Sequence, residues 1–152
     1  MVGKWFGFER EEVFEEALSA FERGDYDEAS KALEACLAED PSDPRVKQYL
    51  GKCYEAMAEG ALQDENYDLA AAMAENATVL HPGFPDLHLL AAKAFRGLRR
   101  TAIARYHLNR ALELHPNFAE ALAFDVEAGP ESVHSGTKPP FRGPQLAKIR
   151  NF

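Results

Sequence analysis

The 152-residue sequence has no apolar run that approaches the ~20 residues of a membrane-spanning helix. Its first residues, MVGKWFGFEREE, contain no apolar stretch of the kind found in signal peptides. Cysteine is scarce: Cys36 and Cys53 are the only two, and both fall in helical patterns. We therefore expect a cytoplasmic protein without membrane contact, in which these cysteines are small buried residues; a disulfide between them is the less favoured alternative.

Sequence signatures of catalysis are also missing. The sequence has no glycine-rich phosphate loop and no HExxH, CxxC or G-x-S-x-G motif. His81 and His115 occupy equivalent turns of a repeat described below, so we interpret them as turn residues. A contact between His88 and His107 is conceivable, but the sequence offers no acidic or thiol third ligand beside them. We therefore predict no catalytic residues, no cofactor and no metal site.

Basic residues are fewer than acidic ones and are unevenly distributed. The chain has 17 Lys and Arg against 25 Asp and Glu, for a net charge of −8 at pH 7. Residues 1–43 carry four basic and thirteen acidic side chains, whereas residues 129–152 carry four basic and one acidic. The net negative charge argues against a nucleic-acid partner, because such binding depends on neutralising many phosphates. The contrast between the two ends indicates either ordinary solvated helix faces or an electrostatic guide for a partner.

What the sequence does contain is an internal repeat. An alanine is followed twelve residues later by a proline three times, and a small residue follows each of these alanines by seven positions. A second helical pattern precedes each of these segments. Each repeat is therefore predicted to be a helix, a short turn and a second helix. The three pairs are Ala29/Pro41, Ala70/Pro82 and Ala104/Pro116.

The second repeat carries the clearest family motif. Leu50-Gly51 is followed by Tyr54, and the repeat closes on Pro82. With its two companions it makes residues 10–118 resemble the tetratricopeptide repeat family, whose period is ~34 residues. The resemblance implies an all-α fold: a right-handed solenoid of three helical hairpins plus a C-terminal capping helix. It also implies protein recognition rather than catalysis.

The repeat boundaries divide the chain into six segments. These are an N-terminal aromatic segment (1–9), three tetratricopeptide-like repeats (10–43, 44–84 and 85–118), a capping helix (119–128) and a Pro/Gly-rich basic tail (129–152).

The second repeat is seven residues longer than the third, and the extra residues lie between Tyr54 and Tyr67. Seven residues correspond to about two helical turns, so we expect the first helix of this hairpin to be longer than its counterparts. Gly60 leaves open an earlier helix end followed by a loop. The sequence does not decide whether the insertion is a contact surface or only an extension.

The resemblance also implies a binding site. In the family, the first helices of successive repeats line a concave groove. By alignment, the peptide-binding residues of this chain are Phe14, Leu18, Phe21, Arg45, Gln48, Tyr49, Lys52, Asp86, Leu89, Leu90, Lys93 and Arg96.

One known use of that groove is excluded by the residues present. Family members that hold the C-terminal carboxylate of heat-shock chaperones use lysine, asparagine and arginine at groove positions that here read Phe14, Leu18, Tyr49, Asp86 and Leu90. The carboxylate clamp is therefore missing. We expect a groove that buries apolar anchors of an extended or helical segment, with its basic residues setting the direction. The alternative is that the apolar residues of the first repeat pack beneath Trp5, Phe6 and Phe8.

The tail carries apolar residues among its basic ones. The tail has a stretch rich in proline and glycine that reaches Pro144, and its large apolar residues lie within or after this stretch: Phe141, Leu146, Ile149 and Phe152. The tail is predicted either to lack regular structure or to dock on its own body or on a second copy, in which case it would occlude the groove and support self-association.

The sequence thus predicts a non-catalytic adaptor or scaffold whose partner is a protein or peptide. Two alternatives stay open. One is a partner-specific chaperone resembling bacterial secretion chaperones with three such repeats. The other is a self-assembling structural unit, which the opposed end charges permit.

Overall fold

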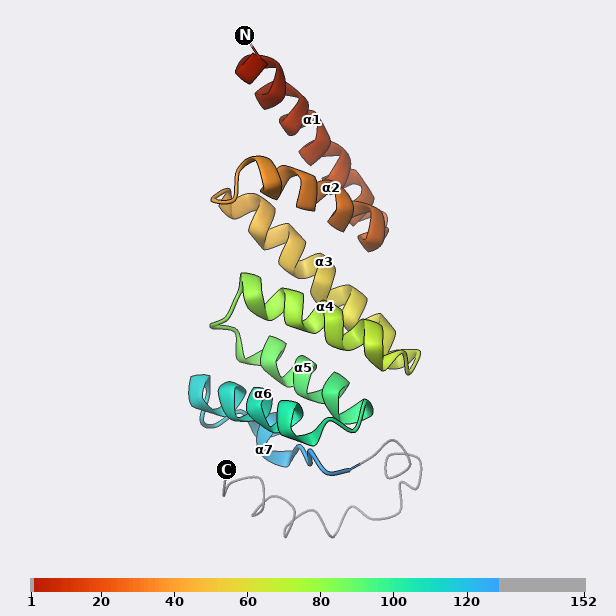
Figure 1. Ribbon diagram of the computed structural model, residues 1–152, viewed down its shortest axis with the longest axis vertical. Helices are drawn as coiled ribbons and strands as arrows, with labels where there is room; N and C mark the ends of the chain where they lie inside the picture. Colours follow the sequence, from red (N-terminus) through yellow and green to blue (C-terminus); the bar gives the residue numbers. More distant parts are fainter. Residues whose placement is uncertain (1, 129–152) are drawn as a thin grey trace. The chain divides into compact units, whose positions relative to one another are not determined.

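The computed structural model describes residues 2–128, with side chains from residue 9 onward. Over this range all regular structure is helical, which confirms the predicted all-α class. The chain divides into two compact units, Met1–Met57 and Ala58–Phe152, and α3 contributes residues to both. The helices of Figure 1 are α1 (Val2–Glu22), α2 (Tyr26–Glu39), α3 (Pro44–Gln63), α4 (Tyr67–Leu80), α5 (Pro85–Gly97), α6 (Thr101–Leu114) and α7 (Ala119–Ala123).

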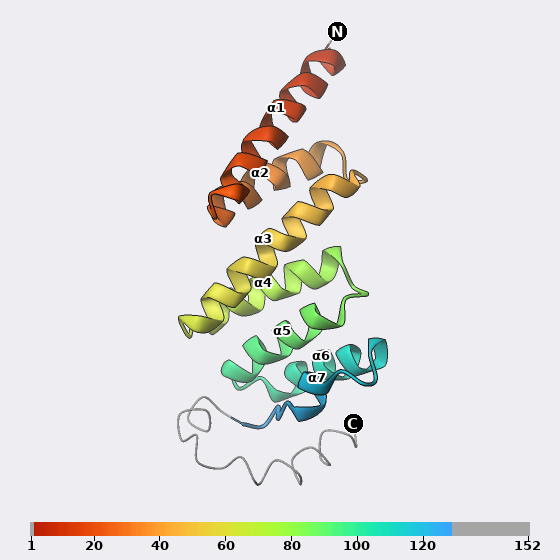
Figure 2. The ribbon, with the colours of Figure 1, turned by 180° about the vertical axis from the view of Figure 1, so that it is seen from behind.

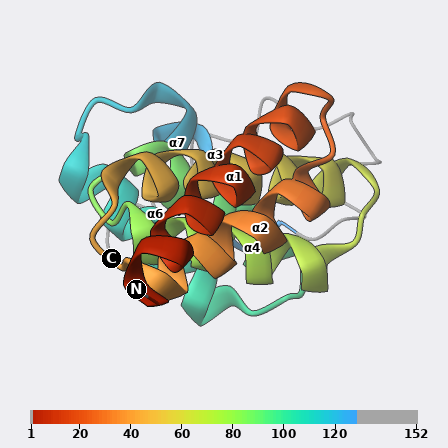
Figure 3. The same cartoon turned by 90° about the horizontal axis from the view of Figure 1, so that it is seen from above.

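In the first unit, α1 and α2 form a hairpin, and the two helices lie side by side in Figures 1 and 3. Small residues make this close packing possible: Ala17 and Ala20 of α1 and Ala29 of α2 are 1% exposed or less. Leu33 and Cys36 complete the buried face of α2. The first helix begins earlier than the sequence indicated, because residues 2–9, predicted as a separate segment, belong to α1.

In the second unit, α4, α5 and α6 are successive neighbours, and α7 contacts α6 (Figure 2). The alanines predicted to permit close helix contact are fully buried here as well, since Ala70 and Ala104 are 0% exposed. Their companions Ala77 and Ala111, seven residues later, are equally buried. Leu108 fills the space beside them as one of the largest buried side chains.

Each hairpin turn has the same backbone form. The second residue past the helix end has a positive φ, of 80° at Gly24, 57° at Glu65 and 60° at Arg99. The next N–H then bonds to a carbonyl five residues earlier, as in a Schellman motif. These bonds run from Asp25 to Ala20 (2.9 Å), from Asn66 to Ala61 (2.8 Å) and from Arg100 to Phe95 (2.9 Å).

The turns between hairpins repeat too. His81 and His115 are the C-cap residues of α4 and α6, which confirms their interpretation as turn residues. The His81 ring stacks on Phe84, with ring centroids 5.0 Å apart, and the His115 ring stacks on Phe118 at 5.6 Å. These stacked pairs fix the chain where it leaves one hairpin and enters the next helix.

The insertion lengthens a helix. The helix α3 has 20 residues and α5 has 13, so the seven extra residues account for the whole difference. It continues through Gly60 to Gln63, which confirms the predicted longer helix and rules out the early stop.

The predicted capping helix is shorter than its predicted range, 119–128. The helix α7 ends at Ala123, and Phe124 adopts an extended backbone with φ −79° and ψ 126°. The Asp125 carboxylate then accepts a hydrogen bond from the Glu127 N–H at 3.0 Å. Because this side chain offers the backbone an alternative to helical bonding, it favours a turn here.

None of the described helices is long and apolar enough to cross a membrane. The tail 129–152, and with it the predictions of docking or self-association, lies outside the described residues. The side chains of Trp5, Phe6 and Phe8 lie outside them as well, so the alternative that they cover the first repeat stays a prediction.

Candidate functional site

The twelve residues predicted to bind a partner divide between the two units. Seven lie on α1 and α3 in the first unit, and five lie on α5 in the second. The two sets differ in what covers them.

In the first unit, the predicted residues form an aromatic cluster. The Tyr49 ring of α3 lies edge-on to two rings of α1, with centroids 6.1 Å from Phe14 and 5.4 Å from Phe21. Phe21 also contacts Tyr26 at 5.5 Å. Edge-to-face pairs at these separations are favourable beyond the area that they bury. The cluster therefore holds these side chains in fixed orientations.

The exposure of this cluster is graded. Phe14 is 4% exposed and belongs to the core, whereas Leu18, Phe21 and Tyr49 are half-buried. We call Leu18, Phe21 and Tyr49 the aromatic patch. Its apolar atoms contact the protein on one side and are open on the other.

Charged and polar side chains border the aromatic patch. The exposed Lys52 ammonium lies 5.7 Å from the Tyr49 ring centroid, and the exposed Gln48 precedes Tyr49 on α3. The Arg45 guanidinium lies 4.7 Å from the Phe14 ring centroid. It also donates to both carboxylate oxygens of Glu11, at 3.1 and 3.3 Å, and these hydrogen bonds lower the pKa of Glu11. Arg45 is thus positioned from two sides, while Lys52 is the exposed cation nearest the patch.

In the second unit, the structure corrects part of the prediction. Leu89 and Leu90 are 2% and 8% exposed and lie in the hydrophobic core, so they are not an open groove floor. Asp86 is exposed, and Lys93 and Arg96 are half-buried. Both leucines pack in one cluster with buried side chains of α4, of α6 and of residues 124–128, a segment that the sequence predicted as helix and that we call the strap.

The strap lies against α5. The Arg96 guanidinium stacks over the Phe124 ring at 4.2 Å and donates to the carbonyl oxygen of Asp125 at 3.3 Å. Phe124 and Val126 join the same buried apolar cluster as Leu89 and Leu90. Two of the predicted groove residues of α5 are therefore in the core with the strap, and a third holds it.

Ion pairs flank the strap on both sides. Lys93 of α5 pairs with Glu120 of α7, before the strap. Arg105 of α6 pairs with Glu127 of the strap at 3.3 Å. Both are partly exposed, so each contributes on the order of 0–1 kcal/mol. Their main effect is to fix the direction of the strap along the hairpin.

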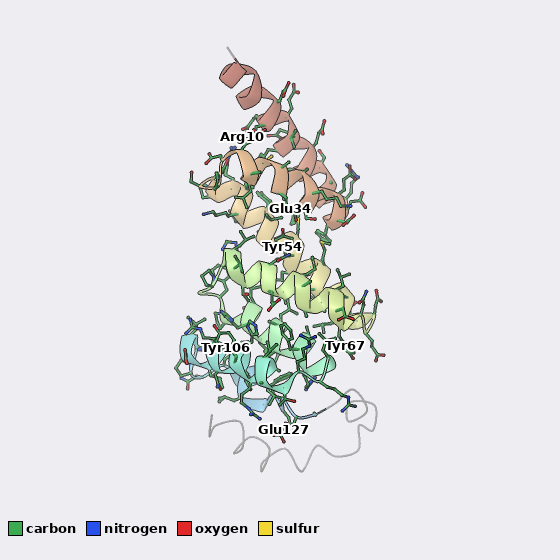
Figure 4. The ribbon with its side chains drawn as sticks, viewed as in Figure 1. Arg10, Glu34, Tyr54, Tyr67, Tyr106 and Glu127 are labelled. Carbon is green, nitrogen blue, oxygen red and sulfur yellow. The ribbon has the colours of Figure 1, made fainter. Side chains whose placement is uncertain are left out.

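The extended end of α3 forms one side of a pocket that the sequence did not predict. The pocket has a volume of about 240 Å³. Its lining combines residues at the end of α3 with the basic end of α5. It also includes Tyr67, at the start of α4, which is labelled in Figure 4. The lining residues are Leu62, Gln63, Glu65, Tyr67, Lys93, Arg96 and Gly97.

Two histidines meet inside the second unit, as the sequence left open. The Nδ1 atoms of His88 and His107 are 3.3 Å apart, and His88 Nε2 lies 2.9 Å from the Pro82 carbonyl oxygen. The Pro82 carbonyl oxygen can only accept, so His88 donates to it from Nε2, and the Nδ1 of His88 then accepts from the Nδ1–H of His107. Burial, reinforced by His88, lowers the pKa of His107 to about 4. Over residues 9–128 no group of three or more His, Cys, Asp or Glu side chains is placed to hold a metal ion.

Comparison with known proteins also finds the repeat. The sequence matches two tetratricopeptide repeat family models, one over residues 20–60 and the other over residues 55–119. No curated protein sequence matches the chain significantly.

Solved structures of similar fold include three MamA proteins. MamA AMB-1 is 21% identical, with 92% of this chain and 70% of that chain covered and a TM-score of 0.54. MamA MSR-1 is 21% identical, with 91% and 74% covered and a TM-score of 0.52. MamA from Desulfovibrio magneticus RS-1 is 15% identical, with 93% and 74% covered and a TM-score of 0.52. Together with the family models, which span residues 20–119, and the repeated turns, this likeness of fold shows that the chain belongs to the tetratricopeptide repeat family.

Proposed function

We propose that the protein is a non-catalytic interaction module, an adaptor that binds an apolar-anchored peptide or helix of a partner protein at the aromatic patch. The observation that carries the proposal is the half-exposed Tyr49, fixed by two phenylalanine rings and bordered by Lys52. Rigid, partly exposed aromatic side chains next to a cation are the usual anchors of protein interfaces. The buried free thiols of Cys36 and Cys53 fit the reducing cytoplasm that we propose as its location.

The patch favours an apolar anchor over a free carboxylate. Arg45 is already engaged by Glu11 and Asp43, so its charge is largely satisfied within the unit. Lys52 is exposed and can pair with one acidic residue of a partner. We therefore expect ligands with one or two large apolar residues and an acidic residue beside them.

A peptide selection tests this proposal. The full chain is immobilised, peptides are selected from a random phage-displayed library, and the affinities of the enriched peptides are measured by calorimetry. We expect Tyr49→Ala to weaken binding about tenfold or more, as truncation of a central aromatic anchor does. Lys52→Glu, which changes only an exposed side chain, is expected to weaken binding of acidic peptides.

The matched control is Tyr106→Ala, because Tyr106 is a 58% exposed tyrosine on α6, in the second unit. Helical circular dichroism of each variant ensures that it is folded. Enriched peptides that bind the Tyr49 variant as well as the unchanged chain would move the site elsewhere. A selection that enriches no peptide would contradict recognition of short segments altogether.

A further inference from the structure

The strap has the composition of a bound ligand. Its sequence, Phe-Asp-Val-Glu-Ala, alternates apolar and acidic residues. The apolar residues Phe124 and Val126 are 7% and 2% exposed, whereas Glu127 is exposed and pairs with Arg105. The strap thus places apolar side chains in the core and an acidic one toward basic residues.

The surface beneath the strap is basic at its edges. Arg96 stacks on the Phe124 ring of the strap and donates a hydrogen bond to the Asp125 carbonyl. Arg105 pairs with Glu127 near the other end of the strap. Lys93 pairs with Glu120, just before the strap. Arg96 and Arg105, from two helices, therefore contact the strap itself, and Lys93 pairs just before it, so basic side chains border a segment that carries acidic ones.

The strap is held differently from the helices. It is not helical: the Phe124 N–H donates to the Ala121 carbonyl of α7 at 3.2 Å, and the carbonyl of Asp125 accepts from Arg96 and from the strap's own Ala128 N–H, both at 3.3 Å. Local openings have lower free energies than global unfolding, so a short non-helical segment can detach while the helices stay folded. Detachment of the strap would expose Leu89, Leu90 and Arg96 together.

We propose that residues 124–128 are an intramolecular ligand of the α5 surface, and that a partner segment with the same chemistry, an aromatic anchor followed by alternating acidic and apolar residues, displaces them. This inference rests on the proposed function and names a second contact surface and its ligand class. The apparent Kd of a partner for the α5 surface is then its intrinsic Kd divided by the fraction of molecules whose strap is detached. The strap makes this surface selective, because a partner must match its chemistry to compete.

The test uses a fluorescein-labelled peptide of residues 119–128 and fluorescence anisotropy. In the unchanged chain the attached strap competes, so the peptide should bind weakly. In the full chain with Phe124→Ala and Val126→Ala, we expect binding at least tenfold tighter. Adding Arg96→Ala to that variant should reverse the gain, and a peptide whose Phe and Val are replaced by Ala should not bind.

Folding of the variants is checked by circular dichroism, and Phe124→Ala alone replaces the double variant if the latter does not fold. A folded strap variant that binds the peptide no better than the unchanged chain would overturn the proposal, as would binding that is insensitive to Arg96→Ala. An unfolded Phe124→Ala variant would also overturn it, because the strap would then be an inseparable part of the core.

Two readouts separate this inference from the proposed function. Tyr49→Ala is expected to leave binding of the 119–128 peptide unchanged, since Tyr49 lies in the first unit. If the strap variant does not bind the 119–128 peptide more tightly, but Tyr49→Ala still weakens binding of the selected peptides, only the inference is overturned. Sedimentation at the assay concentration addresses self-association: a dimer lost on Arg96→Ala would make a second copy the occupant and overturn the assignment to a partner.

Discussion

The ring of Tyr67, at the start of α4, lies on the backbone of Gly97 at the end of α5. A Cβ atom at Gly97 would lie 2.1 Å from Tyr67 Cδ1 and 2.4 Å from its Cγ and Cε1, far inside van der Waals contact. Glycine is therefore required for the approach of these two helices, and the same contact forms one wall of the pocket at the insertion.

We predict that Gly97→Ala destabilises the protein by roughly 1–3 kcal/mol, because the added methyl group forces the tyrosine or the helix to move. The free energy of unfolding, measured in urea, provides the check. Tyr67→Ala in the same background should remove the clash and recover part of the loss. Equal stabilities of the unchanged chain and Gly97→Ala would show that the ring moves aside at no cost.

Gly60 is the matched control for this substitution. It lies inside α3, and a Cβ atom there would have nothing within 4 Å. Because alanine favours helix over glycine, Gly60→Ala should stabilise the protein by about 0.5–1 kcal/mol. A destabilising Gly60→Ala would indicate that the insertion needs flexibility at this point.

The repeat could be recognised in the sequence because close helix contacts set the spacing of its small residues. Ala29, Ala70 and Ala104 recur because nothing larger fits where paired helices meet, and all three are fully buried. The seven extra residues likewise had one effect, a longer α3, since neither proline nor a cap interrupts them.

The candidate site was only partly predictable. The sequence assigned Tyr49 and Phe21 to one surface, and their ring centroids lie 5.4 Å apart, but it assigned Leu89 and Leu90 to an open groove although both are buried in the core. Helical periodicity continues past Ala123, so the sequence pattern predicted helix where Phe124 has an extended backbone. The bond from the Glu127 N–H to the Asp125 carboxylate favours a turn there, and Arg96 holds the segment by a tertiary contact that spacing along the chain does not reveal.

The two cysteines of the first unit should be protected from thiol reagents. Cys36 and Cys53 are free and at most 1% exposed, and burial raises the pKa of Cys53 to about 11. Because the thiolate is the reactive form, we expect slow reaction with Ellman's reagent at pH 8 in the native protein and rapid reaction of both thiols in denaturant. Rapid reaction under native conditions would show that α1, α2 and α3 separate readily.

A hydrogen bond between Tyr54 and Glu34 joins α3 to α2 in the first unit. The hydroxyl donates to the carboxylate at 2.6 Å, and Figure 4 shows the two residues beside one another. Tyr54 is 7% exposed, and burial together with this bond raises its pKa. Tyr54→Phe should cost about 1 kcal/mol of unfolding free energy, because the exposed Glu34 can rehydrate when the bond is lost.

Glu34→Gln is the companion variant, since it keeps an acceptor but removes the charge. Thermal unfolding should place it between the unchanged chain and Tyr54→Phe. If both variants unfold at the temperature of the unchanged chain, the hydrogen bond contributes nothing net to stability.

The buried His107 should make stability depend on pH. Its folded-state pKa of about 4 lies below the ordinary value of 6.5, so the unfolded chain binds more protons between these values. Stability is then fully present above pH 6.5 and is lost as pH falls toward 4. Between pH 7.5 and pH 5 the loss from this one group is about 2 kcal/mol.

Urea unfolding at the two pH values measures this loss, and His107→Gln is the informative variant. Glutamine does not titrate, so the variant should lose most of the pH dependence. The hydrogen bonds from Arg45 lower the pKa of Glu11 and Asp43, so the stability tied to these two groups is lost only in more acidic solution. An equal fall in stability for both proteins would mean that the protonation responsible occurs on another group.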